Sequence, residues 1–257
     1  MVSRRELLVA ALAGAATSAA GATAKPMLGL VSPVDAVVPP ETAVLYPRGI
    51  DFQTASVGLK TMTPDGYDAV LERIEPVAKA LVRQGARGIV LMGTSLSFYK
   101  GAAFNRELTR RLQEASGLPA VTMSTAVIEG LRRVGARRLA VATAYGAEVN
   151  HRLQTFLGEE GFEVVALQGL GIENVADIQD VTQEGLLKFS TSVFESARGA
   201  DGLLISCGGL RTLDLIEPLE RHCHVPVVSS VPHALLAGVR LLGLGGRVPG
   251  YGRLLSL

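Results

Sequence analysis

The chain contains an internal repeat, and this repeat limits the folds open to it. Residues 85–93, Gly-Ala-Arg-Gly-Ile-Val-Leu-Met-Gly, align without a gap on residues 199–207, Gly-Ala-Asp-Gly-Leu-Leu-Ile-Ser-Cys. A second pair follows in the same order, Leu-Pro-Ala-Val at 118–121 and Val-Pro-Val-Val at 225–228. One such match between two strand-and-helix units is common by chance. Two in the same order predict two similar halves facing each other.

Short apolar runs alternate with longer amphipathic segments, which predicts an α/β fold with parallel sheets. The predicted strands are Met27–Val31, Gly88–Met92, Ala120–Thr122, Leu139–Thr143, Glu163–Leu167, Gly202–Ile205 and Val225–Val228. The predicted helices are Thr63–Gln84, Asn105–Ala115, Val127–Val134, Asn150–Glu160, Val181–Ala197, Asp214–His222 and His233–Leu241.

With the repeat, this pattern predicts two α/β halves related by a pseudo-two-fold axis, with the active site in the cleft between them. The first half is predicted to comprise residues 27–124 plus 231–257, and the second residues 125–230.

The first 24 residues have the pattern of an export signal of the twin-arginine type. Arg4 and Arg5 precede an uncharged run rich in Ala and Gly, and residues 22–24, Ala-Thr-Ala, offer a cleavage site. The apolar run is shorter than a membrane span, so we expect no stable membrane association. The sequence therefore predicts a periplasmic protein, with a cytoplasmic protein bearing an Ala-rich extension as the alternative.

Charge and cysteine content exclude several classes. The 25 basic and 24 acidic residues give a formal net charge of +1, whereas nucleic-acid binders usually have a basic excess. Two cysteines are too few for a disulfide scaffold. His222, Cys223 and His224 are neighbours along a helix and point in different directions, so we expect no metal site.

Reactive groups follow the two repeated strands. Gly93, Thr94 and Ser95 offer hydroxyls and a close backbone approach, which suits an anion. Cys207 stands at the matching point of the second copy, before the two glycines Gly208 and Gly209. Tyr145 follows another strand and offers a further hydroxyl donor. Because ligands of open parallel sheets lie beyond the carboxyl ends of the strands, we expect these groups to line one cleft.

Several longer segments closely resemble those of the arylmalonate decarboxylase family, within the aspartate/glutamate racemase superfamily. The resemblance covers residues 27–255 and rests on segments 91–105, 122–126, 142–145, 206–210 and 249–254. Racemases of that superfamily have one catalytic cysteine in each half. Here the second half has Cys207, and the first has Gly93 instead. Since racemisation needs an acid/base group on each face of a carbon, a single thiol favours decarboxylation followed by protonation from one side.

The resemblance implies a cofactor-independent decarboxylase of α-aryl malonates in which Cys207 protonates an enediolate. One carboxylate of this small-molecule substrate would be held by Thr94, Ser95, Tyr145 and the amides of Cys207 and Gly208. The other would face an apolar pocket, and the matching positions are Leu59, Tyr67, Leu96 and Val175. Pro33 matches a proline that lies against the aryl ring in that family. No cofactor, metal or nucleic acid is implied.

Two other functions remain open from the sequence. One is isomerase or racemase chemistry on a small dicarboxylate such as maleate, with Cys207 as nucleophile. The other is a periplasmic binding protein for aromatic acids, because two α/β halves around a cleft also describe that class. Release of CO2 from phenylmalonate would distinguish the decarboxylase from both.

Overall fold

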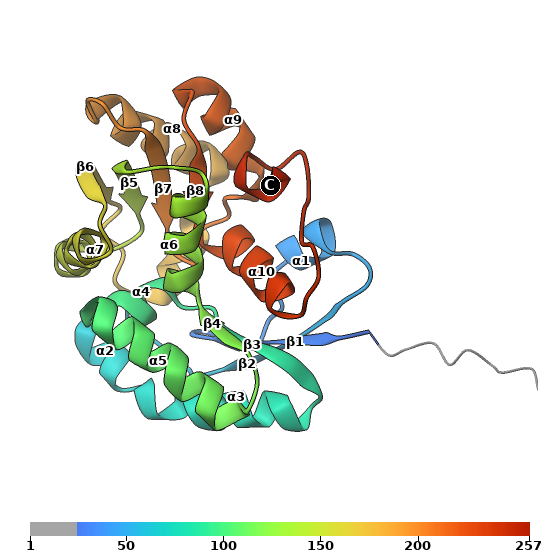
Figure 1. The fold of residues 1–257 in the computed structure, drawn as a ribbon. Coiled ribbons are helices and arrows are strands. Elements are labelled where there is room, and N and C mark those ends of the chain that lie inside the picture. Colours follow the sequence, from blue (N-terminus) through green and yellow to red (C-terminus); the bar gives the residue numbers. More distant parts are fainter. Residues whose placement is uncertain (1–24) are drawn as a thin grey trace, which may run out of the picture.

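The computed structural model describes residues 25–257, which form two four-stranded parallel sheets flanked by helices (Figure 1). The first sheet has the order β2-β1-β3-β4 and the second the order β6-β5-β7-β8. The strands are β1 Met27–Ser32, β2 Asp51–Ser56, β3 Ala86–Leu91, β4 Ala120–Thr122, β5 Arg138–Thr143, β6 Glu163–Gly169, β7 Gly202–Ser206 and β8 Val227–Ser229.

The two sheets repeat the same topology. In each, the first strand in the chain pairs with the second and third, and the third pairs with the fourth. Thus β3 and β7, which carry the first sequence repeat, hold equivalent places, as do β4 and β8, which carry the second. The predicted α/β class with two similar parallel-sheet halves is confirmed.

Helices separate and cover the sheets. The helical segments are α1 Glu41–Leu45, α2 Pro64–Asp68, η1 Leu71–Arg73, α3 Ile74–Arg83, α4 Thr94–Phe98, α5 Gly101–Ser116, α6 Met123–Arg133, α7 Ala147–Glu159, η2 Val175–Asp180, α8 Gln183–Ser196, α9 Leu213–Cys223, α10 Ser230–Leu241 and η3 Leu254–Ser256. Helices α6 and α10 pack against each other between the two sheets (Figure 1). Helix α6 begins directly after β4, the last strand of the first sheet, and α10 begins directly after β8, the last strand of the second. Both helix starts therefore lie at the junction of the halves.

Helix α10 contacts β3 and β4 of the first sheet, although it follows the last strand of the second. The strands β1–β4 fall within residues 27–124, and β5–β8 fall within residues 125–230. The exact domain boundaries stay a prediction.

The structure differs from the sequence-based prediction at β2 and in the segment 63–84. It also contains four short helical segments that the sequence did not predict: α1, α4, η2 and η3. The sequence predicted no strand at β2, because Asp51–Ser56 is polar. In the structure only one of its six residues is buried, which is possible because β2 is an edge strand. The sequence also predicted one helix over residues 63–84, but the chain forms α2, η1 and α3 there. Pro76 is the third residue of α3. A proline ring clashes with the carbonyl four residues earlier, so a helix must restart just before it.

The predicted export signal, residues 1–24, lies outside the described residues. Between residues 25 and 257, no helix has the length and apolar character needed to cross a bilayer.

Candidate active site

A cavity of about 390 Å³ opens at the carboxyl ends of the strands, between the two sheets. Most of the residues that the sequence singled out line it: Pro33, Leu59, Gly93, Thr94, Ser95, Val175, Cys207, Gly208 and Gly209. The other three, Tyr67, Leu96 and Tyr145, are fully buried and do not line the cavity. The structure thus brings together the strand ends of both halves and places the three large side chains behind the wall.

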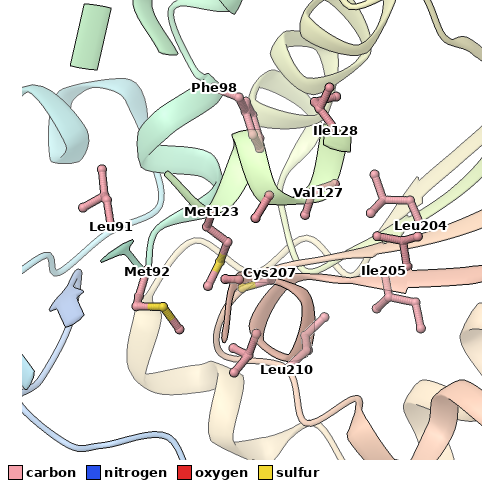
Figure 2. Packing of buried hydrophobic residues seen from close by; sticks show 14 of the residues in the cluster. Leu91, Met92, Phe98, Met123, Val127, Ile128, Leu204, Ile205, Cys207 and Leu210 are labelled. Carbon is pink, nitrogen blue, oxygen red and sulfur yellow. The ribbon is translucent and has the colours of Figure 1, made fainter. Parts of the chain in front are cut away.

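Cys207 directly follows β7 and presents a protonated thiol. Its side chain is 5% exposed and lies beside Met123, with Met92 across from both (Figure 2). Burial raises the pKa of the Cys207 thiol to about 11, because the thiolate loses hydration. Hydrogen bonding from the Gly209 and Leu210 amides favours the thiolate but does not outweigh burial. At neutral pH this group is therefore a proton donor and not a nucleophilic thiolate.

Gly93 occupies the equivalent strand end in the first half, directly after Met92 and before α4. The two loops approach closely, since a methyl group at Gly208 would lie 3.1 Å from the Met92 carbonyl oxygen. A methyl group at Gly93 would lie 3.0 Å from Cβ of Leu96 and 3.2 Å from Cγ of Pro33. A side chain at position 93 would therefore be crowded between Leu96 and Pro33 beside the cavity.

The hydroxyl donors of the first half stand at the start of α4. Thr94 is its first residue and Ser95 its second, and both are buried. Thr94 Oγ1 lies 2.9 Å from Oγ of Ser230, the first residue of α10. The same serine oxygen accepts a hydrogen bond of 3.1 Å from the Cys207 backbone amide. The Cys207 amide, expected from the resemblance to face the substrate, is thus occupied by Ser230.

Ser230 was not among the residues that the sequence indicated. A serine between a short strand and a helix has the pattern of an ordinary helix start, so its contacts with two distant loops had no local signal.

The two buried tyrosines support the wall from behind. The Tyr145 hydroxyl lies 3.2 Å from Ser206 Oγ, and hydrogen bonding from Tyr145 lowers the pKa of the Cys207 thiol. Burial raises the pKa of both Tyr145 and Tyr67, so both stay protonated. The Tyr67 hydroxyl has no hydrogen-bond partner of standard geometry within residues 25–257, although Ser95 is close enough to lower its pKa. Tyr145 therefore contacts the proton donor and is not itself part of the cavity surface.

The opposite wall of the cavity is largely apolar. Pro33 and Leu59 come from the segments after β1 and β2, and Val175 comes from η2, which also supplies Ile178. A methyl group at Gly209 would lie 2.8 Å from Cγ2 of Ile178, so only glycine allows this close packing of η2 on the loop after Cys207. This wall suits an aromatic ring or other apolar group.

Charged residues also stand around the cavity, and the sequence did not indicate them as part of the site. Asp35, Glu41 and Arg211 line it. Burial raises the pKa of the Glu41 carboxyl, while the positive charge of Arg211 acts in the opposite direction. No motif marks these residues, because each lies in a loop or at the start of a short helix.

The remaining cysteine and histidines form no second centre in the described part of the chain. Cys207 and Cys223 are both free thiols. Within residues 25–257, no group of three or more His, Cys, Asp or Glu side chains is placed to hold a metal ion.

Fold and site together define a class of protein: two α/β lobes of like topology, with a single protonated thiol in the cleft between them. A family model described as arylmalonate decarboxylase matches residues 28–255. The chain belongs to the arylmalonate decarboxylase family.

Comparison with individual proteins agrees with this assignment. The chain is 49% identical to an arylmalonate decarboxylase from Bordetella bronchiseptica over 231 residues, covering 89% of this chain and 96% of that protein. It is similar to the liganded structure of a glycine-to-cysteine, cysteine-to-serine double mutant of arylmalonate decarboxylase, with a TM-score of 0.86, 48% identity and coverage of 89% and 98%. A maleate isomerase from Nocardia farcinica is 27% identical, with coverage of 89% and 94%.

Proposed function

We propose that this chain is a carboxy-lyase that decarboxylates α-aryl malonates, with or without an α-methyl group, to α-aryl carboxylic acids without a cofactor. The observation that carries the proposal is one protonated thiol, Cys207, at a strand end whose counterpart in the other half is Gly93. The relative that is 49% identical is an arylmalonate decarboxylase, which supports the same reaction.

The reaction proceeds in two chemical steps, loss of CO2 and protonation of the α-carbon, after which the thiol regains its proton. The bond between the α-carbon and one carboxylate breaks, CO2 leaves, and the electron pair moves into the remaining carboxylate as an enediolate. Hydroxyls of Thr94 and Ser95 and nearby amides stabilise that charge where it develops. The Cys207 thiol then gives its proton to the α-carbon from one side, and water later returns a proton to the thiolate.

The apolar wall favours loss of the second carboxylate. A carboxylate against Leu59 and Val175 is poorly hydrated, and burial of an unpaired charge costs at least several kcal/mol. Because this charge leaves as neutral CO2, relief of that cost lowers the barrier, with about tenfold in rate for each 1.4 kcal/mol.

Isomerisation of a dicarboxylate is the second candidate, because a maleate isomerase is also a relative. That chemistry would use Cys207 as a nucleophile. A thiol whose pKa is about 11 is almost wholly protonated at pH 7, and Gly93 supplies no second thiol. Both observations favour decarboxylation.

The proposal is tested by measuring CO2 release from phenylmalonate and α-methyl-α-phenylmalonate. We expect turnover by the wild type and loss of at least about a thousandfold in Cys207→Ala, since the site then lacks its proton donor. Cys223→Ala, a buried thiol at the end of α9, is the matched control and is expected to keep wild-type activity.

Three results would contradict the proposal. Conversion of maleate to fumarate without CO2 release would indicate an isomerase. A thermal shift with phenylmalonate but no turnover would indicate a binding protein. Full activity in Cys207→Ala would remove the thiol from the mechanism.

A further inference from the structure

One hydroxyl at the start of α10 joins the two walls of the cleft. Ser230 Oγ accepts the backbone N–H of Cys207 at 3.1 Å and lies 2.9 Å from Thr94 Oγ1, which donates to it. Thr94 begins α4 of the first half, and Cys207 follows β7 of the second. Ser230 is 1% exposed, so bulk water does not substitute for either contact.

These two contacts do not use the hydroxyl hydrogen of Ser230. A serine hydroxyl has two lone pairs and one hydrogen. The Cys207 amide and the Thr94 hydroxyl use both lone pairs of Ser230 Oγ, so its own hydrogen is uncommitted. Thr94 has a single hydroxyl hydrogen, which is directed to Ser230 Oγ or to Sδ of Met123, also at 2.9 Å.

An anionic oxygen in the cleft would change where the hydroxyl hydrogens of Thr94 and Ser230 point. Thr94 can stabilise the oxygen only by turning its hydrogen away from both Ser230 and Met123, and it then no longer donates to Ser230 Oγ. Hydroxyl hydrogens rotate while the heavy atoms stay in place, so the hydrogen of Ser230 can then take over the same 2.9 Å contact. The Cys207 amide, bonded to Ser230 Oγ, polarises the hydroxyl and strengthens its donation.

We propose that Ser230 is a positioning residue for decarboxylation: it reverses its hydrogen bond with Thr94 when charge develops, and so holds Thr94 as a donor to the enediolate. The inference rests on the proposed function, because it concerns the same anionic intermediate. Ser230 itself does not line the cavity, so it acts through Thr94.

This role predicts an effect on the chemical step more than on binding. The reversal is needed most where negative charge is greatest, in the transition state and the enediolate, so its loss lowers kcat with little change in KM. It also predicts that Ser230 matters only while Thr94 has a hydroxyl. A residue that merely maintained packing would act equally with or without that hydroxyl.

The experiment is a double-mutant cycle with Ser230→Ala and Thr94→Val, measured with α-methyl-α-phenylmalonate. We expect Ser230→Ala to lower kcat at least about tenfold, with KM within about twofold of the wild type. In the Thr94→Val background, the same change should lower kcat by less than about threefold. The enantiomeric purity of the product should stay unchanged, because the Cys207 thiol keeps its position.

The matched control is Ser190→Ala, which removes another fully buried serine hydroxyl in α8, away from the cleft, and should leave kcat and KM unchanged. Circular dichroism and thermal unfolding check that each variant is folded. If Ser230→Ala does not fold, Ser230→Cys replaces it in the same cycle, because a thiol is nearly as small but a weak donor and acceptor.

Equal losses of kcat in both Thr94 backgrounds, or no loss in either, would overturn the inference. A fall in enantiomeric purity alongside kcat would also overturn it, since Ser230 would then act through Cys207. If the wild type released no CO2, the proposed function would fail and this inference with it, whereas an active wild type with additive losses overturns this inference alone.

Discussion

The protonation state of one sulfur atom determines what the cleft can do. The pKa of the Cys207 thiol is raised from 9.0 to about 11, because burial penalises the thiolate more than the nearby amides stabilise it. A raised pKa in an acid means that the native protein keeps this proton over a pH range in which a free thiol would lose it. The donor form is therefore complete below pH 9 and is lost as the pH approaches 11.

This predicts an unusual alkaline profile. We expect kcat to stay flat through pH 9 and to fall only toward pH 11, and inactivation by iodoacetamide to be slow at pH 8 and to quicken about tenfold per pH unit. The Cys223→Ala variant isolates the modification to Cys207, because burial also raises the pKa of Cys223 to about 11. An inactivation profile with its midpoint at pH 8–9 would mean that the thiolate is stabilised in the cleft.

Residues of the site differed in how far the sequence could reveal them. Cys207 and Gly93 stand out because the repeat aligns them, and the repeat reflects equivalent strand ends. Ser230 and Arg211 have no such signal, since their importance lies in contacts between loops that only the folded chain brings together.

The junction between β8 and α10 depends on a buried histidine. His233 Nδ1 lies 2.8 Å from the backbone nitrogen and 2.6 Å from the carbonyl oxygen of Ser229, the N-cap of α10, and the tautomer decides whether it accepts from the first or donates to the second. Burial lowers the pKa of His233 from 6.5 to about 4, because the charged imidazolium would lose its hydration. A depressed pKa in a base gives stability that is present above pH 6.5 and is lost as the pH falls through 4.

We therefore predict that the free energy of unfolding falls between pH 6.5 and 4 by up to about 3 kcal/mol because of His233. His233→Asn retains an acceptor for Ser229 but does not titrate, so it should be less stable at pH 7 yet lose less stability on acidification. Urea denaturation at both pH values measures this, with His222→Asn, an exposed histidine, as the control. Equal acid slopes in the wild type and His233→Asn would show that His233 does not titrate on unfolding.

Elements buried on both faces were predictable, and those that depend on context were not. The strands β3 and β7 are apolar throughout their central residues, and the sequence predicted both to within two residues at each end. The edge strand β2 is polar, and its existence depends on pairing with β1, which no local pattern reveals. The break between α2 and α3 did have a signal, Pro76, whose clash with the preceding turn outweighs the helical periodicity.

For the whole molecule, the matching sheet orders predict that residue 93 and residue 207 stand on opposite sides of the substrate's α-carbon. Exchanging their side chains should then move the proton donor from one side to the other. The backbone at Gly93 has φ −122°, an ordinary extended conformation, so a cysteine there meets no backbone strain. Its Cβ would lie 3.0 Å from Leu96 Cβ and 3.2 Å from Pro33 Cγ, so these neighbours must move by a few tenths of an ångström.

We predict that Gly93→Cys combined with Cys207→Ser converts α-methyl-α-phenylmalonate into the enantiomer opposite to that formed by the wild type, as chiral chromatography of the product would measure. Activity should fall at least about tenfold, because the new thiol is crowded and lacks the amides that surround Cys207.

Gly93→Cys alone places a thiol on each side and should slowly racemise an enantiopure arylpropionate, since one thiolate removes the α-proton and the other thiol returns it to the opposite face. The Cys207→Ser single variant is the control and should form neither enantiomer at the rate of the double variant. A double variant that is active yet gives the original enantiomer would mean that Gly93 does not face Cys207 across the substrate, and the two-fold arrangement of the site would then be wrong even though the two sheets share one topology.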